Sequence, residues 1–266
     1  MIVCPLLSGS SGNATYVESG SSRVLIDAGA SGAALEKNLR KIGVDPVSLT
    51  HILVTHAHDD HIRGVGVASR RYDLPVYASE GVWNEFANRS CVGRIMTRNM
   101  KVFHSSGSGA LQLGDLTASY FSTPHDAYDS VGYVLSDGAV KFGLATDFGR
   151  VTPSIRQHLL GCDVVLLESN YDYDMLMNGP YPYDLKRRIR GPEGHLSNEE
   201  AGSFAVELAR AGAKHIYLGH LSENNNNPRL AHKVVKTILE DAGVDLTRDC
   251  ALHMTKRYEP SLKLIL

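Results

Sequence analysis

Three features that would place this chain in a membrane or outside the cell are missing from its sequence. No apolar run approaches the ~18 residues of a membrane span, and no Lys or Arg precedes Arg23, so the start lacks the basic region of a signal peptide. Only four cysteines occur, without a CxxC pair, which argues against a disulfide framework or a zinc finger. We therefore expect a cytoplasmic protein that does not contact membranes.

A strong excess of basic residues is also absent. The formal net charge is −2 and the pI is about 6.6, which excludes a protein that coats DNA through its overall charge but allows a local basic patch. The 43% of hydrophobic residues can fill a sizeable core. Because no repeat is visible and the short Asn run at 224–227 is the nearest approach to a linker, we expect one domain over residues 1–266.

Strand and helix patterns are mixed along the chain, which predicts an α/β (α+β) fold. The strand patterns lie at 13–19, 22–29, 51–55, 75–79, 116–123, 130–137, 140–147, 163–169, 215–220 and within 251–266. The helical patterns lie at 32–43, 62–73, 153–160, 198–211 and from Pro228 to 243. The segment 169–194 reads as long, irregular and aromatic.

The stretch "HILVTHAHDDH" at 51–61 holds four of the 12 histidines. Within it, His56, His58, Asp60 and His61 form the pattern H-x-H-x-D-H directly after a strand. Residues i and i+2 of an extended segment point the same way, so His56 and His58 can bind one metal ion side by side. Imidazole and carboxylate suit zinc, and also manganese or iron. A solvated polar loop is the alternative, and this density of ligands argues against it.

More ligands are expected where other strands end, because a strand end places a side chain on a rigid scaffold. His125 follows the strand at 116–123, Asp147 ends the one at 140–147, and His220 ends the one at 215–220. Each alone could equally be a turn or capping residue. Together with the cluster they make seven candidate ligands, enough for two divalent ions.

This order of motifs, with Asp27 at an earlier strand end, resembles the metallo-β-lactamase-fold hydrolases. The resemblance implies a four-layer αββα sandwich with two divalent ions, zinc or manganese with iron as an option. It implies His56, His58 and His125 on the first ion. It implies Asp60, His61 and His220 on the second, with Asp147 bridging. Asp27 would order the histidine loop without binding a metal.

Further motifs narrow the resemblance. The opening "LLSGSSGNATYVE", the "TPHDA" around His125 and "GHLSENNNNP" after His220 are similar to the YycJ/WalJ-type bacterial proteins. Relatives of that group act on nucleic-acid phosphodiesters as exonucleases. The resemblance therefore implies a metal-dependent nuclease that cleaves DNA or RNA with a hydroxide held between two ions about 3.5–4 Å apart. The alternatives are a lactonase or thioesterase on the same fold, and a non-catalytic nucleic-acid-binding or regulatory module.

Two residues are candidates for catalysis besides Asp60. His195 precedes a predicted helix in "GHLSNEEA", an arrangement that resembles the element beside the scissile phosphate in tRNA-maturing relatives. It would donate a proton to the leaving oxygen or bind the phosphate. Glu168, at the end of a strand, would orient His195 or a metal-bound water. The alternatives are a histidine that merely flanks a helix and a solvated glutamate.

A basic and aromatic segment is the candidate substrate contact. Within "YDYDMLMNGPYPYDLKRRIR" at 171–190, aromatic rings could stack on unpaired bases and basic groups could follow phosphates. The candidates are Tyr181, Tyr183, Lys186, Arg187, Arg188 and Arg190. The expected partner is thus single-stranded DNA or RNA. An arm that packs a homodimer is an equally weighted alternative, and both roles can hold together.

Overall fold

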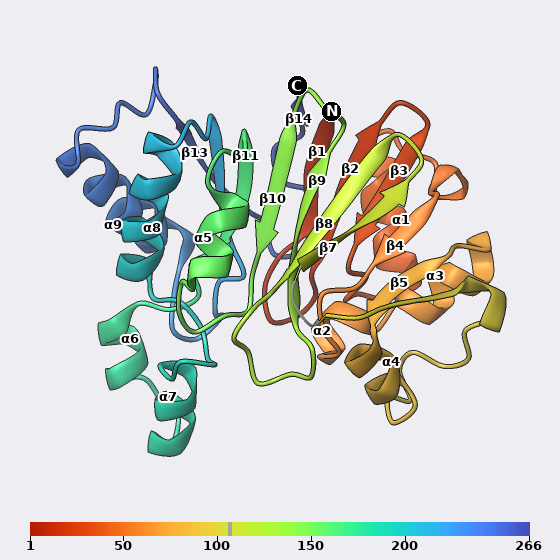
Figure 1. Ribbon diagram of the computed structural model, residues 1–266. Coiled ribbons are helices and arrows are strands. Elements are labelled where there is room, and N and C mark those ends of the chain that lie inside the picture. Colours follow the sequence, from red (N-terminus) through yellow and green to blue (C-terminus); the bar gives the residue numbers. More distant parts are fainter. Residues whose placement is uncertain (106–107) are drawn as a thin grey trace. The chain divides into compact units, whose positions relative to one another are not determined.

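The computed structural model describes residues 1–105 and 108–266. In these residues the strands form two seven-stranded sheets, accompanied by helices (Figure 1). The strand orders are β14-β1-β2-β3-β4-β5-β6 and β13-β12-β11-β10-β9-β8-β7. The predicted mixed α/β class is confirmed.

The chain divides into two compact units. Unit 1 holds Met1–Tyr120, Ala127–Val131 and Thr255–Leu266, and unit 2 holds Phe121–Asp126 and Gly132–Met254. Each unit has a buried apolar cluster of its own. The expectation of a single domain over residues 1–266 stays a prediction.

Unit 1 carries the first sheet. Its strands are β1 (Ile2–Leu7), β2 (Ala14–Ser19), β3 (Ser22–Ile26), β4 (His51–Leu53), β5 (Val76–Ser79), β6 (Met100–Phe103) and β14 (Leu264–Ile265). Its helices are α1 (Gly32–Lys41), α2 (Asp59–Ile62), α3 (Val65–Tyr72) and α4 (Glu80–Phe86), with short 3₁₀ turns η1 (Pro46–Ser48) and η2 (Thr97–Asn99). The predicted hairpin is present as antiparallel β2 and β3, whereas β3 to β6 run parallel. Parallel strands end at the same edge of a sheet, so the segments after β3 and β4 lie together.

Unit 2 carries most of the second sheet. Its strands are β9 (Val131–Ser136), β10 (Lys141–Ala145), β11 (Val164–Glu168), β12 (His215–Gly219) and β13 (Ala251–Met254), preceded by β7 (Ser108–Leu113) and β8 (Leu116–Ser122). Its helices are α5 (Pro153–Leu159), α6 (Tyr173–Asn178), α7 (Tyr183–Ile189), α8 (Asn198–Arg210) and α9 (Pro228–Asp241). Strands β10 to β13 run parallel. Helices α5, α8 and α9 pack their buried apolar residues against them (Figure 1).

Helix ends follow the local signals in the sequence. Ser197 and Glu200 form the capping box that begins α8, as the spacing predicts. Asn227 caps α9 and Pro228 is its first residue. Gly43 lies just beyond α1 with a φ of 81°, a conformation that costs glycine little. Within the described residues, no helix combines the length and the apolarity needed to cross a bilayer.

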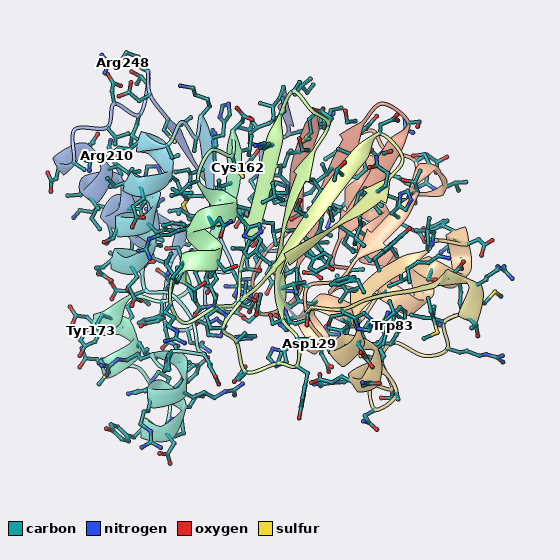
Figure 2. The ribbon with its side chains drawn as sticks, viewed as in Figure 1. Trp83, Asp129, Cys162, Tyr173, Arg210 and Arg248 are labelled. Atoms are coloured by element: carbon teal, nitrogen blue, oxygen red, sulfur yellow. The ribbon has the colours of Figure 1, made fainter. Side chains whose placement is uncertain are left out.

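The prediction that 169–194 is irregular is wrong, because this segment contains the two short helices α6 and α7. Asp172 caps α6 by accepting a hydrogen bond from the Met175 backbone N–H at 2.9 Å. Lys186 on α7 donates to the carbonyls of Met177 and Gly179, both at 2.8 Å. These bonds tie α7 to the carboxyl end of α6, and Figure 2 labels Tyr173 at the start of α6. Tertiary contacts of this kind cannot be read from periodicity.

Candidate metal centre

The histidine motif of unit 1 folds as a loop that leads from β4 into α2. His58 is the N-cap residue of α2, which places Asp60 and His61 on its first turn. The ring of His56 lies 4.7 Å from that of His58 and 4.1 Å from that of His61, measured between centroids. His56 and His61 are buried. Three imidazoles are thus gathered at the edge where β4 ends.

Asp27 holds this loop in place from the end of β3. Its Oδ1 accepts from the Thr55 backbone N–H at 2.8 Å, and its Oδ2 accepts from the Thr55 hydroxyl at 2.8 Å. The same Oδ2 lies 2.7 Å from His61 Nδ1. A carboxylate at Nδ1 orients the imidazole and leaves Nε2 as the nitrogen that can ligate a metal.

Asn13, in the turn between β1 and β2, is a member of this cluster that the sequence reading missed. Its side-chain nitrogen lies 3.2 Å from Asp60 Oδ2 and 3.0 Å from His61 Nε2. Its backbone N–H donates to the Asp60 carbonyl at 2.7 Å. This approach requires Gly29, because a Cβ there would come within 1.5 Å of the Asp60 carbonyl oxygen. The sequence holds no local signal for this contact, because Asn13 and His61 are 48 residues apart.

The ligand candidates of unit 2 also meet at strand ends. Asp147 follows β10, Glu168 is the last residue of β11, and His220 follows β12. His195 reaches the same place from the segment before α8. Each of the four offers a ligand atom, and these atoms all lie within 4.8 Å of one another. Adjacent parallel strands explain why residues far apart in sequence meet here.

Glu168 is the centre of this cluster. Its Oε1 lies 2.8 Å from His195 Nδ1 and 2.9 Å from His220 Nδ1. Its Oε2 accepts from the backbone N–H groups of Phe148 and Leu196, both at 3.2 Å. The side chain is completely buried, so the alternative of a solvated strand-end glutamate is wrong.

The pKa values in this cluster reflect burial and charge pairing. Burial alone would raise the pKa of Glu168, but the charge of His195 and hydrogen bonds from His195 and His220 outweigh it and lower the pKa. Burial alone would lower the pKa of His195, but the charge and hydrogen bond of Glu168 raise it. Both shifts favour the charged forms, a carboxylate at Glu168 and an imidazolium at His195, whose Oε1 and Nδ1 atoms are 2.8 Å apart.

Backbone strain coincides with the predicted site residues. Asp27, Asp147 and His220 have φ values of 60°, 62° and 55°. This left-handed conformation costs a residue other than glycine on the order of 1–3 kcal/mol, somewhat less for aspartate. Such strain persists where the surroundings enforce it, and it concentrates at functional sites. Three separate strand ends bear it here.

His125 lies in the loop that follows β8. Its Nε2 is 3.4 Å from Asp126 Oδ1 and 3.8 Å from Asp147 Oδ1. Its ring centroid lies 5.3 Å from that of His195. Burial lowers the pKa of His125, with Asp147 partly opposing this. A lowered pKa favours the neutral imidazole, which is the form that binds metals.

The basic segment is only partly available to a substrate. Lys186 is committed to the end of α6, and Arg188 forms an ion pair with Asp126. Arg190 stacks on Tyr173, with Cζ 5.0 Å from the ring centroid. Arg187 is three-quarters exposed, with Asp184 at 3.9 Å. Of the two predicted tyrosines, Tyr183 is 71% exposed, whereas the Tyr181 hydroxyl accepts a hydrogen bond from Asn224.

The donor atoms of both clusters fit divalent metal ions. They are imidazole nitrogens and carboxylate oxygens, the set that zinc, manganese and iron share. They are gathered on rigid strand ends, and carboxylates orient His61, His195 and His220 through Nδ1. The number of ions and their identity stay predictions.

Comparisons with known proteins agree with this architecture. A model of the beta-lactamase superfamily domain matches residues 22–221. The chain is 38% identical over 256 residues to exodeoxyribonuclease YycJ of Bacillus anthracis, covering 96% of each chain. It is 35% identical over 250 residues to exodeoxyribonuclease WalJ of Streptococcus pneumoniae, covering 94% of this chain and 92% of the relative. The structure superposes on the metallo-beta-lactamase fold protein YhfI of Bacillus subtilis with a TM-score of 0.73, at 18% identity over the full length of both.

Proposed function

The chain belongs to the metallo-β-lactamase superfamily of hydrolases, and on that basis we propose that it is a metal-dependent exonuclease that hydrolyses phosphodiester bonds of single-stranded DNA. Two relatives that are similar over more than nine-tenths of this chain are named exodeoxyribonucleases. That similarity favours DNA over RNA, and a phosphodiester over a lactone or thioester.

For the metals we propose the ligand set that the family resemblance implies. It comprises His56, His58, Asp60, His61, His125, Asp147 and His220. When bound, divalent ions supply Lewis-acid chemistry, since they draw charge from the phosphate and make water acidic enough to attack near neutral pH. The contribution of Asp27 and Asn13 is to hold the histidine loop, because Asp27 contacts His61 Nδ1 and the Asn13 backbone N–H donates to the Asp60 carbonyl.

His195 is the proposed proton donor to the leaving oxygen. Glu168 holds its Nδ1 at 2.8 Å, which fixes the ring and leaves Nε2 as the nitrogen that can face a substrate. About one-fifth of the His195 side chain is exposed, whereas Glu168 is buried. A deoxyribose alkoxide is a poor leaving group, so a positioned acid is worth about 10²–10⁴-fold in rate.

The observation that carries the proposal is that one carboxylate serves both histidines. Glu168 Oε1 lies within 2.9 Å of the Nδ1 atoms of His195 and His220. It therefore orients a proposed metal ligand and a proposed acid from a single atom. A structural histidine beside a helix would not require a completely buried glutamate whose four acceptor positions face N–H groups.

A substrate panel tests the proposal. The metal-free protein, reloaded separately with zinc and with manganese, would be assayed on single-stranded DNA, single-stranded RNA, bis-p-nitrophenyl phosphate and a set of lactones and thioesters. We expect metal-dependent hydrolysis of DNA and of the p-nitrophenyl phosphodiester. Turnover of a lactone or thioester without any phosphodiester cleavage would contradict the proposal. Nucleic-acid binding without hydrolysis under any metal would favour a non-catalytic module.

A further inference from the structure

A second basic region lies in unit 1, where the sequence has a long stretch free of acidic residues. No Asp or Glu occurs between Glu85 and Asp115, whereas Arg89, Arg94, Arg98 and Lys101 fall in that interval. The stretch therefore carries a local positive charge within a chain whose net charge is −2. Such a local excess is the electrostatic signature of a surface that meets an anion.

The start of this stretch lies against the histidine loop. Arg89 Nη1 is 3.3 Å from Asp59 Oδ1, and Cys91 Sγ is 3.6 Å from the same oxygen. Asp59 follows His58 directly in the chain. The segment that connects α4 to η2 therefore runs from the proposed metal ligands out along α3. Gly66 on α3 allows this close approach, because a Cβ there would come within 1.8 Å of the Val92 carbonyl oxygen.

Further along the chain, residues 94–98 and α3 line a cavity of about 420 Å³ that is open to solvent. It is lined by Arg70, Arg94, Met96, Thr97 and Arg98. Arg70 is held in place, because its Nη1 donates to the carbonyls of Val92 at 3.3 Å and Arg94 at 2.6 Å. A guanidinium fixed by backbone carbonyls keeps its charge and its remaining donors for a ligand.

The cavity is positively charged. Arg98 pairs with Asp73 at 2.9 Å, but among the described residues neither Arg70 nor Arg94 has a carboxylate partner within 4 Å. Met96, which is 43% exposed, adds an apolar surface beside the guanidinium groups. Guanidinium groups with adjacent apolar surface suit a phosphate joined to a sugar and a base. At about 420 Å³ the space exceeds that of a single phosphate group.

We propose that this arginine pocket, formed by Arg70, Arg94 and Arg98, binds the backbone phosphate of a nucleic-acid strand away from the bond that is cleaved. The inference rests on the proposed function, because it assigns the pocket to that same substrate. Its link to the site is the segment that begins at the Arg89–Asp59 ion pair. The pocket lets the enzyme hold a strand longer than the nucleotide being removed.

The test is the affinity of the protein for a labelled single-stranded oligonucleotide, measured by fluorescence anisotropy at several salt concentrations. EDTA is present so that the strand is not cleaved. Arg94 is the residue to change, since its side chain is exposed and makes no hydrogen bond or ion pair to the described residues. Loss of one phosphate contact should reduce the slope of log K against log salt concentration by about 0.7. At 0.1 M salt this corresponds to binding that is about fivefold weaker. Arg94→Lys should restore the slope, because it keeps the charge.

Arg248→Ala is the matched control. This arginine lies in the loop after α9 (Figure 2), and its side chain is 75% exposed. The substitution changes the net charge by the same amount, but Arg248 lies outside the pocket and pairs with Asp249. The salt slope of Arg248→Ala should therefore equal that of the unmodified protein. If the salt slope of Arg94→Ala equals that of the unmodified protein, the proposed role of the arginine pocket is overturned and the nuclease proposal stays intact. An equal loss in Arg248→Ala would also overturn it, since a diffuse field would then explain binding.

The same variants on bis-p-nitrophenyl phosphate separate the two proposals. This substrate has no second backbone phosphate, so Arg94→Ala should hydrolyse it at the unmodified rate. Failure of the unmodified protein to bind any single strand would overturn the nucleic-acid substrate and the pocket with it. A loss of bis-p-nitrophenyl phosphate hydrolysis in Arg94→Ala would place the residue in the reaction and contradict a remote phosphate contact.

Discussion

Replacing Glu168 by Gln removes one charge and keeps the shape of the side chain. In the unmodified protein both carboxylate oxygens face N–H groups, with histidines on one side and the Phe148 and Leu196 backbone on the other. A glutamine presents one oxygen and one NH₂ group, so it can satisfy both sides only if the histidines change from donors to acceptors. If its oxygen faces the backbone, His195 and His220 must become acceptors at Nδ1. The proton of His220 then moves to Nε2, where it blocks metal binding.

The magnitude follows from the bonds that are lost. In one orientation of the amide the two backbone hydrogen bonds fail, and in the other the two charged bonds to the histidines are replaced by neutral ones. Each hydrogen bond to a buried charged group contributes roughly 1.5–3 kcal/mol. We take the lower end, because the amide retains the remaining two contacts. Glu168→Gln should therefore lower the free energy of unfolding of the metal-free protein by about 3 kcal/mol. It should also reduce metal occupancy and slow phosphodiester hydrolysis.

The difference in stability should depend on pH in a defined window. The pKa of Glu168 is lowered by folding, so its contribution is complete above its ordinary value of 4.5 and disappears as the pH falls below that value. The pKa of His195 is raised, so its contribution is complete below 6.5 and disappears as the pH rises through the raised value. The gap between the two proteins should be largest between pH 4.5 and 6.5.

Urea unfolding of both metal-free proteins at several pH values measures this gap. Glu200→Gln is a control, because Glu200 caps α8 and makes no contact with the histidines. A gap below about 1 kcal/mol at pH 6, or one that is constant from pH 4 to pH 8, would refute the ion pair. Normal metal occupancy in Glu168→Gln would refute its role in setting the tautomer of His220.

Three further predictions concern the proposed chemistry. His195→Ala should retain its metal but lose about 10²–10⁴-fold in rate on an oligonucleotide and far less on a p-nitrophenyl phosphodiester, whose leaving group needs no proton; equal losses on both would indicate phosphate binding instead. Asp147→Ala should lower total metal content in elemental analysis by more than one ion per chain if this carboxylate bridges; a replete protein with at most one ion would refute the two-metal model. Arg187→Ala should reduce the slope of log K for strand binding against log salt by about 0.7. Arg188→Ala should reduce this slope less, because Asp126 already pairs with Arg188. Slopes in both variants equal to that of the unmodified protein would favour the alternative that the segment packs a homodimer.

Local patterns in the sequence were sufficient for the positions of strand ends and of most ligand candidates. His125, Asp147 and His220 were found because each comes where an apolar run stops, and the structure confirms these runs as strands, whereas Asp27 entered through the family resemblance. The capping box at Ser197 was equally readable, because its two bonds join residues three apart. Features that depend on neighbours in sequence are visible without coordinates.

Features that depend on contacts between residues far apart in the sequence were not visible without coordinates. Asn13 is 48 residues from His61, and nothing local says that the β1–β2 turn reaches α2. Glu168 could be read either as the residue that orients His195 or as a solvated strand-end glutamate, because its partners His195 and His220 are 27 and 52 residues away. Lys186 and Arg188 appeared available for a substrate, yet the fold gives each an internal partner. Charge in a sequence predicts a patch, but only the fold says which charges are already neutralised.

The central claim, metal-dependent removal of nucleotides from a DNA end, is tested most directly by digesting one single-stranded oligonucleotide labelled separately at its 5′ and 3′ ends. With metal present, we expect one label to be released at once as a mononucleotide while the other passes through a ladder of shortening strands. A chelator should abolish both patterns, and metal should restore them. Internal cuts that generate mid-length fragments from both labels at the outset, or digestion that persists in the chelator, would contradict the account.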